Sequence, residues 1–193
     1  NADSPLTLDV AKGSIGYTTL LHEIGHAIGL KHPSPENTAG PLTVGPYLSN
    51  SLDNVTISAM SYNQADPNID NAANPTTMSM LDIEALQYLY GAVSNVSRGG
   101  LTHVVSSSSR AFETLWLPEA GIIDSIDASL HTLGVSINLN PGTVSYRIQP
   151  GVGTGYRPLF GIGFDSWVEN ASSGSGADRL EGNRLNNQLN GGD

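Results

Sequence analysis

The chain has 193 residues, of which 38% are hydrophobic and 13% charged, a composition typical of a globular protein. Its 8 basic and 18 acidic residues give a formal charge of -10, which argues against nucleic-acid or anionic-membrane partners and is compatible with divalent cations. Cysteine is absent, which excludes disulfides and thiolate ligands, and no apolar stretch is long enough to span a bilayer. No signal peptide is visible, and both termini suggest a fragment of a longer chain.

The first predicted element is a helix over residues 15–28. Ser14 is a suitable N-cap, and Gly29 can end the helix because glycine adopts a positive φ without a Cβ penalty. We expect the apolar positions of this helix to form its buried stripe: Leu20, Leu21, Ile24, Ala27 and Ile28.

This helix carries the pattern H-E-x-x-H-x-x-G-x-x-H, which runs from His22 to His32. His22 and His26 are about 40° and roughly 6 Å apart on a helix, so both imidazoles leave one face, and a chain reversal at Gly29 can add His32 as a third ligand. Three ligands leave one position open for water, as in catalytic zinc sites, and Glu23 is placed to act as general base. The alternative is a set of surface histidines on an amphipathic helix.

Residues 33–75 are rich in Pro, Asn, Ser and Asp without a sustained period, which predicts a long irregular excursion. A second helix is expected over residues 80–90, because Ser79 and Asp82 resemble a capping box and Gly91 is a suitable stop. We interpret this second helix as a core-packing element.

After Gly91 the sequence changes to short β-prone runs divided by Gly, Pro and Asn, at residues 103–105, 122–123 and 135–139. This texture predicts a β-rich second region. His103 and His131 lie within it without a partner at ligand spacing, so we interpret them as ordinary strand or surface residues.

Residues 169–193 are dominated by Gly, Asn, Ser and Asp, with Leu180 and Leu189 nine residues apart. Such spacing predicts a parallel β-roll, in which the leucines point inward and glycine-rich loops bind calcium between stacked turns. Asp178 is the clearest candidate calcium ligand. A flexible Gly/Ser linker is the alternative, because little more than one turn is present.

Three segments in this order resemble the serralysin-type metzincins, secreted bacterial zinc endopeptidases: residues 22–33, 58–63 and 82–91. The resemblance continues through residues 116–129 and 168–171 into glycine-rich RTX repeats. It implies an α+β fold that begins with a truncated metzincin catalytic domain over residues 1–91, made of the active-site helix, the Met-turn and the C-terminal helix. Residues 92–193 would be a β-rich region that leads into an RTX parallel β-roll from about residue 173.

The resemblance also implies two further site residues. Met60 would be the methionine of the Met-turn, an apolar floor beneath the histidines, and an ordinary core methionine is the alternative. Tyr62 would be a further zinc ligand that can swing away to stabilise the developing oxyanion, and a buried structural tyrosine is the alternative.

The chain also departs from the family pattern. A sheet-and-helix segment that holds the substrate precedes the zinc helix in the family, whereas 21 residues precede His22, so we expect that segment to be missing. Glu36 and Asn37 stand where a tyrosine often follows the His-Pro pair. Residues 117–124 replace a glycine pair and an acidic residue, which weakens a calcium site there, although Asp124 and Asp127 are retained.

Together these features predict a zinc-dependent endopeptidase with catalytic Zn²⁺ and structural Ca²⁺. We expect a protein or peptide substrate, no nucleic-acid partner, a monomer, and export to the extracellular space, as implied by the family's type I secretion. Two other interpretations stay open. The chain could be a non-catalytic zinc- and calcium-binding module that acts in secretion or surface attachment, or a metzincin that cleaves a bacterial partner protein.

Overall fold

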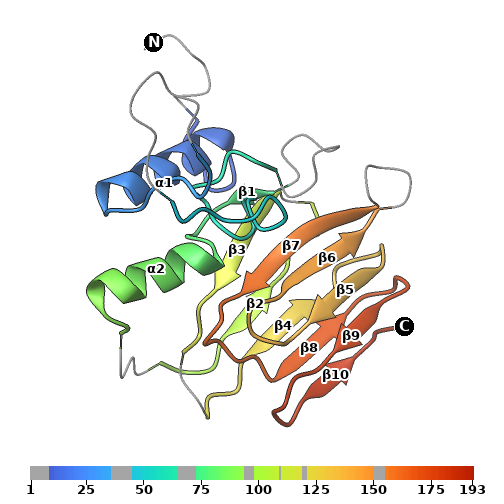
Figure 1. Cartoon of the computed structure of the whole chain (residues 1–193). Helices are drawn as coiled ribbons and strands as arrows, with labels where there is room; N and C mark the ends of the chain where they lie inside the picture. The colour runs from blue at the N-terminus through green and yellow to red at the C-terminus, as the bar shows by residue number, and fades with distance from the viewer. Residues whose placement is uncertain are drawn as a thin grey trace.

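The computed structural model describes residues 9–35, 45–64, 73–93, 98–108, 110–118, 121–149 and 155–193. These residues form an α+β fold of two helices and two β-sheets (Figure 1). Both helices lie at the end of the molecule where β1 and β3 are found. Glu36 and Asn37 lie outside the described residues. No helix in the described part of the chain combines the length and apolar character needed to cross a membrane.

The helices are α1 (Ile15–Ala27) and α2 (Met80–Tyr90). The strands are β1 (Asn74–Pro75), β2 (Thr102–Val104), β3 (Ala111–Leu115), β4 (Ser125–Ala128), β5 (Val135–Asn138), β6 (Val144–Ile148), β7 (Tyr156–Ile162), β8 (Asn170–Ser173), β9 (Arg179–Glu181) and β10 (Gln188–Asn190). One sheet has the order β1-β3-β7-β6-β5-β9, and the other has the order β10-β8-β4-β2.

Helix α1 begins and ends as its sequence predicts. The Ser14 side chain accepts a hydrogen bond from the Tyr17 N–H, and Gly29 has a φ of 98° just beyond the helix. The Gly29 N–H donates to the His26 carbonyl and the Leu30 N–H to the Gly25 carbonyl, which is a Schellman motif. This reversal turns the chain back along the helix.

The predicted buried stripe of α1 is wrong. Leu20 and Ile24 are 49% and 46% exposed, and Ala27 is exposed too, whereas Gly16, His22 and Gly25 are the buried positions. The small glycines allow close approach of α1 to the chain beneath it, so the helix turns its histidine face inward and leaves part of its apolar face outward. Leu21 and Ile28 are half-buried.

Helix α2 has the expected capping box of Ser79 and Asp82, and the Gly91 N–H closes its last turn on the Gln87 carbonyl. Its first turn is joined to the irregular chain before it, because the Leu81 N–H donates to the Ile57 carbonyl and the Ser79 hydroxyl to the Val55 carbonyl. The segment over residues 45–64 has turns and bends but no helix or strand.

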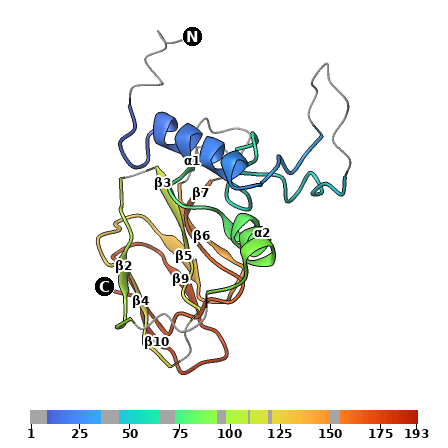
Figure 2. The ribbon, with the colours of Figure 1, turned by 90° about the vertical axis from the view of Figure 1, so that its left-hand side faces the viewer.

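The two sheets face each other, with the larger core between them (Figure 2). Alternating inward side chains such as Leu115, Ile126, Ile137 and Phe160 fill this core. Most pairs among the described strands are parallel, and of these pairs only β5-β6 and β6-β7 are antiparallel. Strand β1 pairs with β3, so the sheet continues into the chain that precedes α2.

Two expectations for the β-rich region are corrected. Ile122 and Ile123 form no strand, because they lie in the loop before β4, where Ile123 is exposed. His131 is neither a strand nor a surface residue: it follows β4 and is almost completely buried. The half-buried His103 does lie on β2, with its ring 5.6 Å from that of Phe160.

The leucines of the predicted repeat both lie on strands, Leu180 on β9 and Leu189 on β10. Leu180 packs against the core, as an inward position should, whereas Leu189 is partly exposed on the edge strand of its sheet. Strand β10 pairs in parallel with β8, and Gln188 lies opposite Asn170.

Candidate metal centre

Three imidazoles meet where the Schellman reversal returns the chain to α1. The His32 Nε2 atom lies 2.9 Å from the His22 Nε2 and 3.0 Å from the His26 Nε2. In the part of the chain that the structure describes, these histidines are the only group of three or more His, Asp or Glu side chains that could hold a metal. The four-residue spacing of His22 and His26 on the helix predicted that these two rings share a face, and the reversal at Gly29 allows His32 to join them.

Backbone carbonyls fix the tautomers of two of these rings. The His22 Nδ1 lies 3.1 Å from the Ala59 carbonyl oxygen, and the His26 Nδ1 lies 3.0 Å from that of Leu30. A carbonyl only accepts, so each Nδ1 carries the proton and each Nε2 keeps its lone pair. Lone pairs that face one another at about 3 Å suit a shared cation, so the ring geometry fits zinc.

Burial lowers the pKa of His22 below its usual value, and the neighbouring His32 and His26 add to this shift. The hydrogen bond to Ala59 and the charge of Glu23 oppose it. A lowered pKa keeps the imidazole neutral near pH 7, which is the protonation state that a metal ligand needs.

Glu23 and Tyr62 lie beside the ring cluster and not within it. Glu23 is exposed and lines a cavity of about 240 Å³ together with His22, Tyr62 and the threonines of α1. The Tyr62 ring centre lies 5.2 Å from that of His22 and 4.6 Å from that of His32. Tyr62 is 72% exposed, so the alternative interpretation of this residue as a buried structural tyrosine is wrong.

Met60 is fully buried under α1, where Gly25 passes over it. A Cβ at position 25, between His22 and His26, would lie 2.3 Å from the Met60 sulfur, so a larger residue there would have to displace the buried methionine side chain. The methionine therefore sets how closely α1 approaches residues 58–62.

The described carboxylates of the β-rich region do not gather into a second cluster. The Asp178 Oδ1 accepts a hydrogen bond from the Val135 N–H, while its buried Oδ2 has no hydrogen-bond partner among the described residues. At the following turn the side-chain amides of Asn183 and Asn187 donate to the carbonyls of Leu139, Val168 and Glu169. Hydrogen bonds from side-chain amides therefore close this turn.

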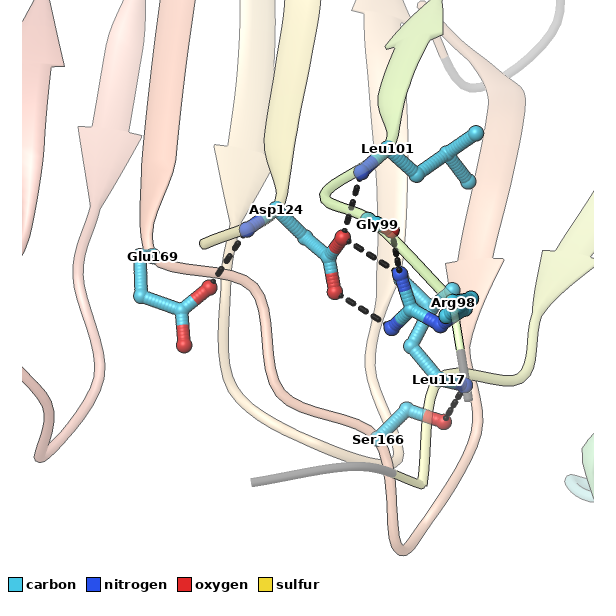
Figure 3. A network of polar contacts seen from close by, with 7 residues as sticks. All are labelled: Arg98, Gly99, Leu101, Leu117, Asp124, Ser166 and Glu169. Carbon is cyan, nitrogen blue, oxygen red and sulfur yellow. Dashed lines mark hydrogen bonds and ion pairs between the residues drawn. The ribbon is translucent and has the colours of Figure 1, made fainter. Parts of the chain in front are cut away.

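Asp124, which the family pattern retains, is engaged by the protein itself (Figure 3). Arg98 donates to both of its carboxylate oxygens at 2.7 Å, and the Leu101 N–H donates to Oδ1 at 2.8 Å. The Asp124 N–H in turn donates to the Glu169 carboxylate. Asp127 differs, because hydrogen bonds from Ser129 lower the pKa of this half-buried carboxylate, and it joins no group of possible metal ligands among the described residues.

The fold and the site define an α+β protein with three histidines, on a helix and the following reversal, that could hold a metal ion. The chain is 34% identical over 196 residues to "Metalloprotease AprA" of Pseudomonas entomophila (strain L48), an alignment that covers 92% of this chain and 39% of that protein. It is 34% identical to "Serralysin C" of Dickeya chrysanthemi (93% of this chain, 38% of that protein) and 31% identical to "Serralysin" of Photorhabdus laumondii (95% and 40%). No family model matches the chain.

The sequence is thus similar to serralysin-type metalloproteases along nearly all its length. The chain spans about two-fifths of the length of the curated relatives it matches.

Sequence reasoning missed the groups that hold the ligands in place. The carbonyls of Ala59 and Leu30 have no side-chain signature, so no pattern could have indicated them. Asp82 was assigned only to a helix cap, although its carboxylate also binds residues 58 and 59.

Proposed function

We propose that this chain belongs to a zinc endopeptidase, and that His22, His26 and His32 hold the zinc. The observation that carries the proposal is the convergence of three Nε2 atoms beside one exposed carboxylate, on a chain of serralysin type. A structural zinc site would use a fourth protein ligand in place of the open position.

Zinc, when bound, supplies an electrophilic centre that makes a water acidic and polarises the scissile carbonyl. Glu23 is placed to take a proton from the attacking water and to pass it to the leaving amine nitrogen. Tyr62 is placed to donate its hydroxyl proton in a hydrogen bond to the developing oxyanion, after its ring moves clear of the histidines. Met60 supports both from beneath by fixing the distance between α1 and residues 58–62.

We further propose that residues 1–91 form part of a metzincin catalytic domain and that residues 92–193 lead into an RTX β-roll. The parallel pairing of β10 with β8 at twice the leucine spacing supports the β-roll. Protein or peptide substrates, a monomeric state and secretion by the type I route follow from the same family likeness. The cavity of about 240 Å³ next to Glu23 could receive a substrate side chain.

Calcium is proposed only at Asp178. The buried Asp178 Oδ2 has no hydrogen-bond partner among the described residues, and a buried carboxylate oxygen of this kind is a suitable ligand for a cation. The turn over residues 182–188 is closed by amides, so a calcium ion is not proposed there.

The test is zinc content by elemental analysis together with hydrolysis of a quenched peptide library by the full chain. We expect one zinc per chain and measurable cleavage. Glu23→Gln should keep the zinc and lose at least a hundredfold in rate, whereas the matched change Glu181→Gln on β9 should keep both. A chain with zinc but no cleavage would favour the non-catalytic module, and a Glu23→Gln variant with normal rate would remove the general-base role.

A further inference from the structure

Asp82 makes more contacts than a helix cap requires. Its side chain is buried at 4% exposure, and its Oδ2 accepts the Ser79 N–H at 2.9 Å, which is the capping contact. It also accepts the Ala59 N–H at 2.6 Å on Oδ2 and the Ser58 hydroxyl at 2.7 Å on Oδ1. Two of its three hydrogen bonds therefore reach a segment that lies more than twenty residues earlier in the chain.

These contacts continue to the metal centre through a single peptide group. The Met60 N–H donates to the Ser58 hydroxyl oxygen at 3.2 Å, and the carbonyl of the same peptide, that of Ala59, accepts from the His22 Nδ1 at 3.1 Å. A continuous chain of donors and acceptors thus runs from the Asp82 carboxylate through Ser58 and the 59–60 peptide to His22. Hydrogen bonds in such a chain polarise one another, most strongly inside a protein.

We propose that Asp82 is a positioning residue for the metal centre, which acts through Ser58 and the 59–60 peptide to fix the tautomer and orientation of the His22 ring. The inference rests on the proposed zinc site. The negative charge of Asp82, at the far end of this series of hydrogen bonds, makes the Ala59 carbonyl a better acceptor. A stronger bond to that carbonyl in turn makes the His22 Nε2 a better electron donor. Its bond to the Ala59 N–H holds that residue from the other side.

The same loop contains a second buried hydrogen bond between a serine and an aspartate, and this one does not lead to any of the three histidines. Ser61 is as buried as Ser58 and donates to Asp53, which is buried as well. Among the described residues, the Asp53 carboxylate accepts hydrogen bonds from the side chains of Ser61 and Asn63, and these bonds lead to none of the three histidines. Changes at Ser61 and Asp53 therefore control for the loss of a buried serine–carboxylate bond in the same loop.

The test measures zinc dissociation constants of the full chain by competition with a chromogenic chelator, and the visible spectrum of the cobalt-substituted protein. We expect Asp82→Asn and Ser58→Ala to weaken zinc binding about 10- to 100-fold and to shift the cobalt bands, because the outer partners of a ligand tune its metal. The zinc dissociation constants of Ser61→Ala and Asp53→Asn should stay within threefold of the wild-type value, even where the Tm of these variants falls as far as that of Asp82→Asn or Ser58→Ala.

The outcomes separate the two levels of the proposal. Wild-type zinc affinity in both Asp82→Asn and Ser58→Ala, or an equal loss in the control pair, would overturn the positioning role and leave the zinc site intact. Absence of zinc binding in the wild type would overturn the proposed function and this inference together. If Asp82→Asn does not fold, Ser58→Ala decides, because it keeps the capping bond and breaks only the path to His22.

Discussion

Arg98 is predicted to be essential for the stability of the β-rich region. The Asp124 side chain is 1% exposed and that of Arg98 is 21% exposed, and two hydrogen bonds of 2.7 Å join them (Figure 3). Arg98→Met keeps most of the side-chain length but removes both guanidinium hydrogen bonds from the buried Asp124 carboxylate, which keeps the one from the Leu101 N–H. Loss of one partner of a buried ion pair lowers the free energy of unfolding by about 3–5 kcal/mol. Because Arg98 is partly exposed, we expect a loss of about 3 kcal/mol here.

In a chain of this size, such a loss corresponds to a fall in Tm of roughly 6–12 °C. The measurement is thermal and urea unfolding of the zinc-loaded chain at pH 7.5, with Arg179→Met as the matched control. Arg179 and Glu181 form an exposed pair at 3.2 Å, for which we expect a change in unfolding free energy of about 0.5 kcal/mol or less. An Arg98→Met variant no less stable than Arg179→Met would refute the reasoning.

Three other expectations concern the site and the charged groups around it. Tyr62→Phe should keep one zinc per chain and lower kcat about 100- to 1,000-fold, because one oxyanion donor is removed; an unchanged kcat would exclude that role. Burial lowers the pKa values of His22, His103 and His131, so the unfolded chain binds more protons and the zinc-free fold should lose stability as the pH falls below about 6.5. Urea unfolding at pH 7.5 and 5.5 measures this loss, which should be smaller in His131→Gln; an equal loss would show that the buried imidazole does not contribute. Calcium should raise the Tm of the wild type but not of Asp178→Asn, and a rise in both would place the ion elsewhere.

The sequence alone determined the features that depend on near neighbours in the chain. The spacing of His22 and His26 on a helix, the reversal at Gly29 and the capping box of α2 each involve atoms a few residues apart. Their geometry follows from backbone conformation, so the pattern was sufficient to predict them. Glu23 beside the first histidine follows from the same local geometry.

Only the tertiary structure decided which partners these groups meet. The exposure of Leu20 and Ile24 depends on which face of α1 finds a close surface, and Gly25 against Met60 selects the histidine face. The link from Asp82 to His22, and the pairing of Arg98 with Asp124, join residues far apart in the chain. Such contacts are set by the packing of whole elements against one another, because a buried charge must find a donor wherever the fold brings one within reach.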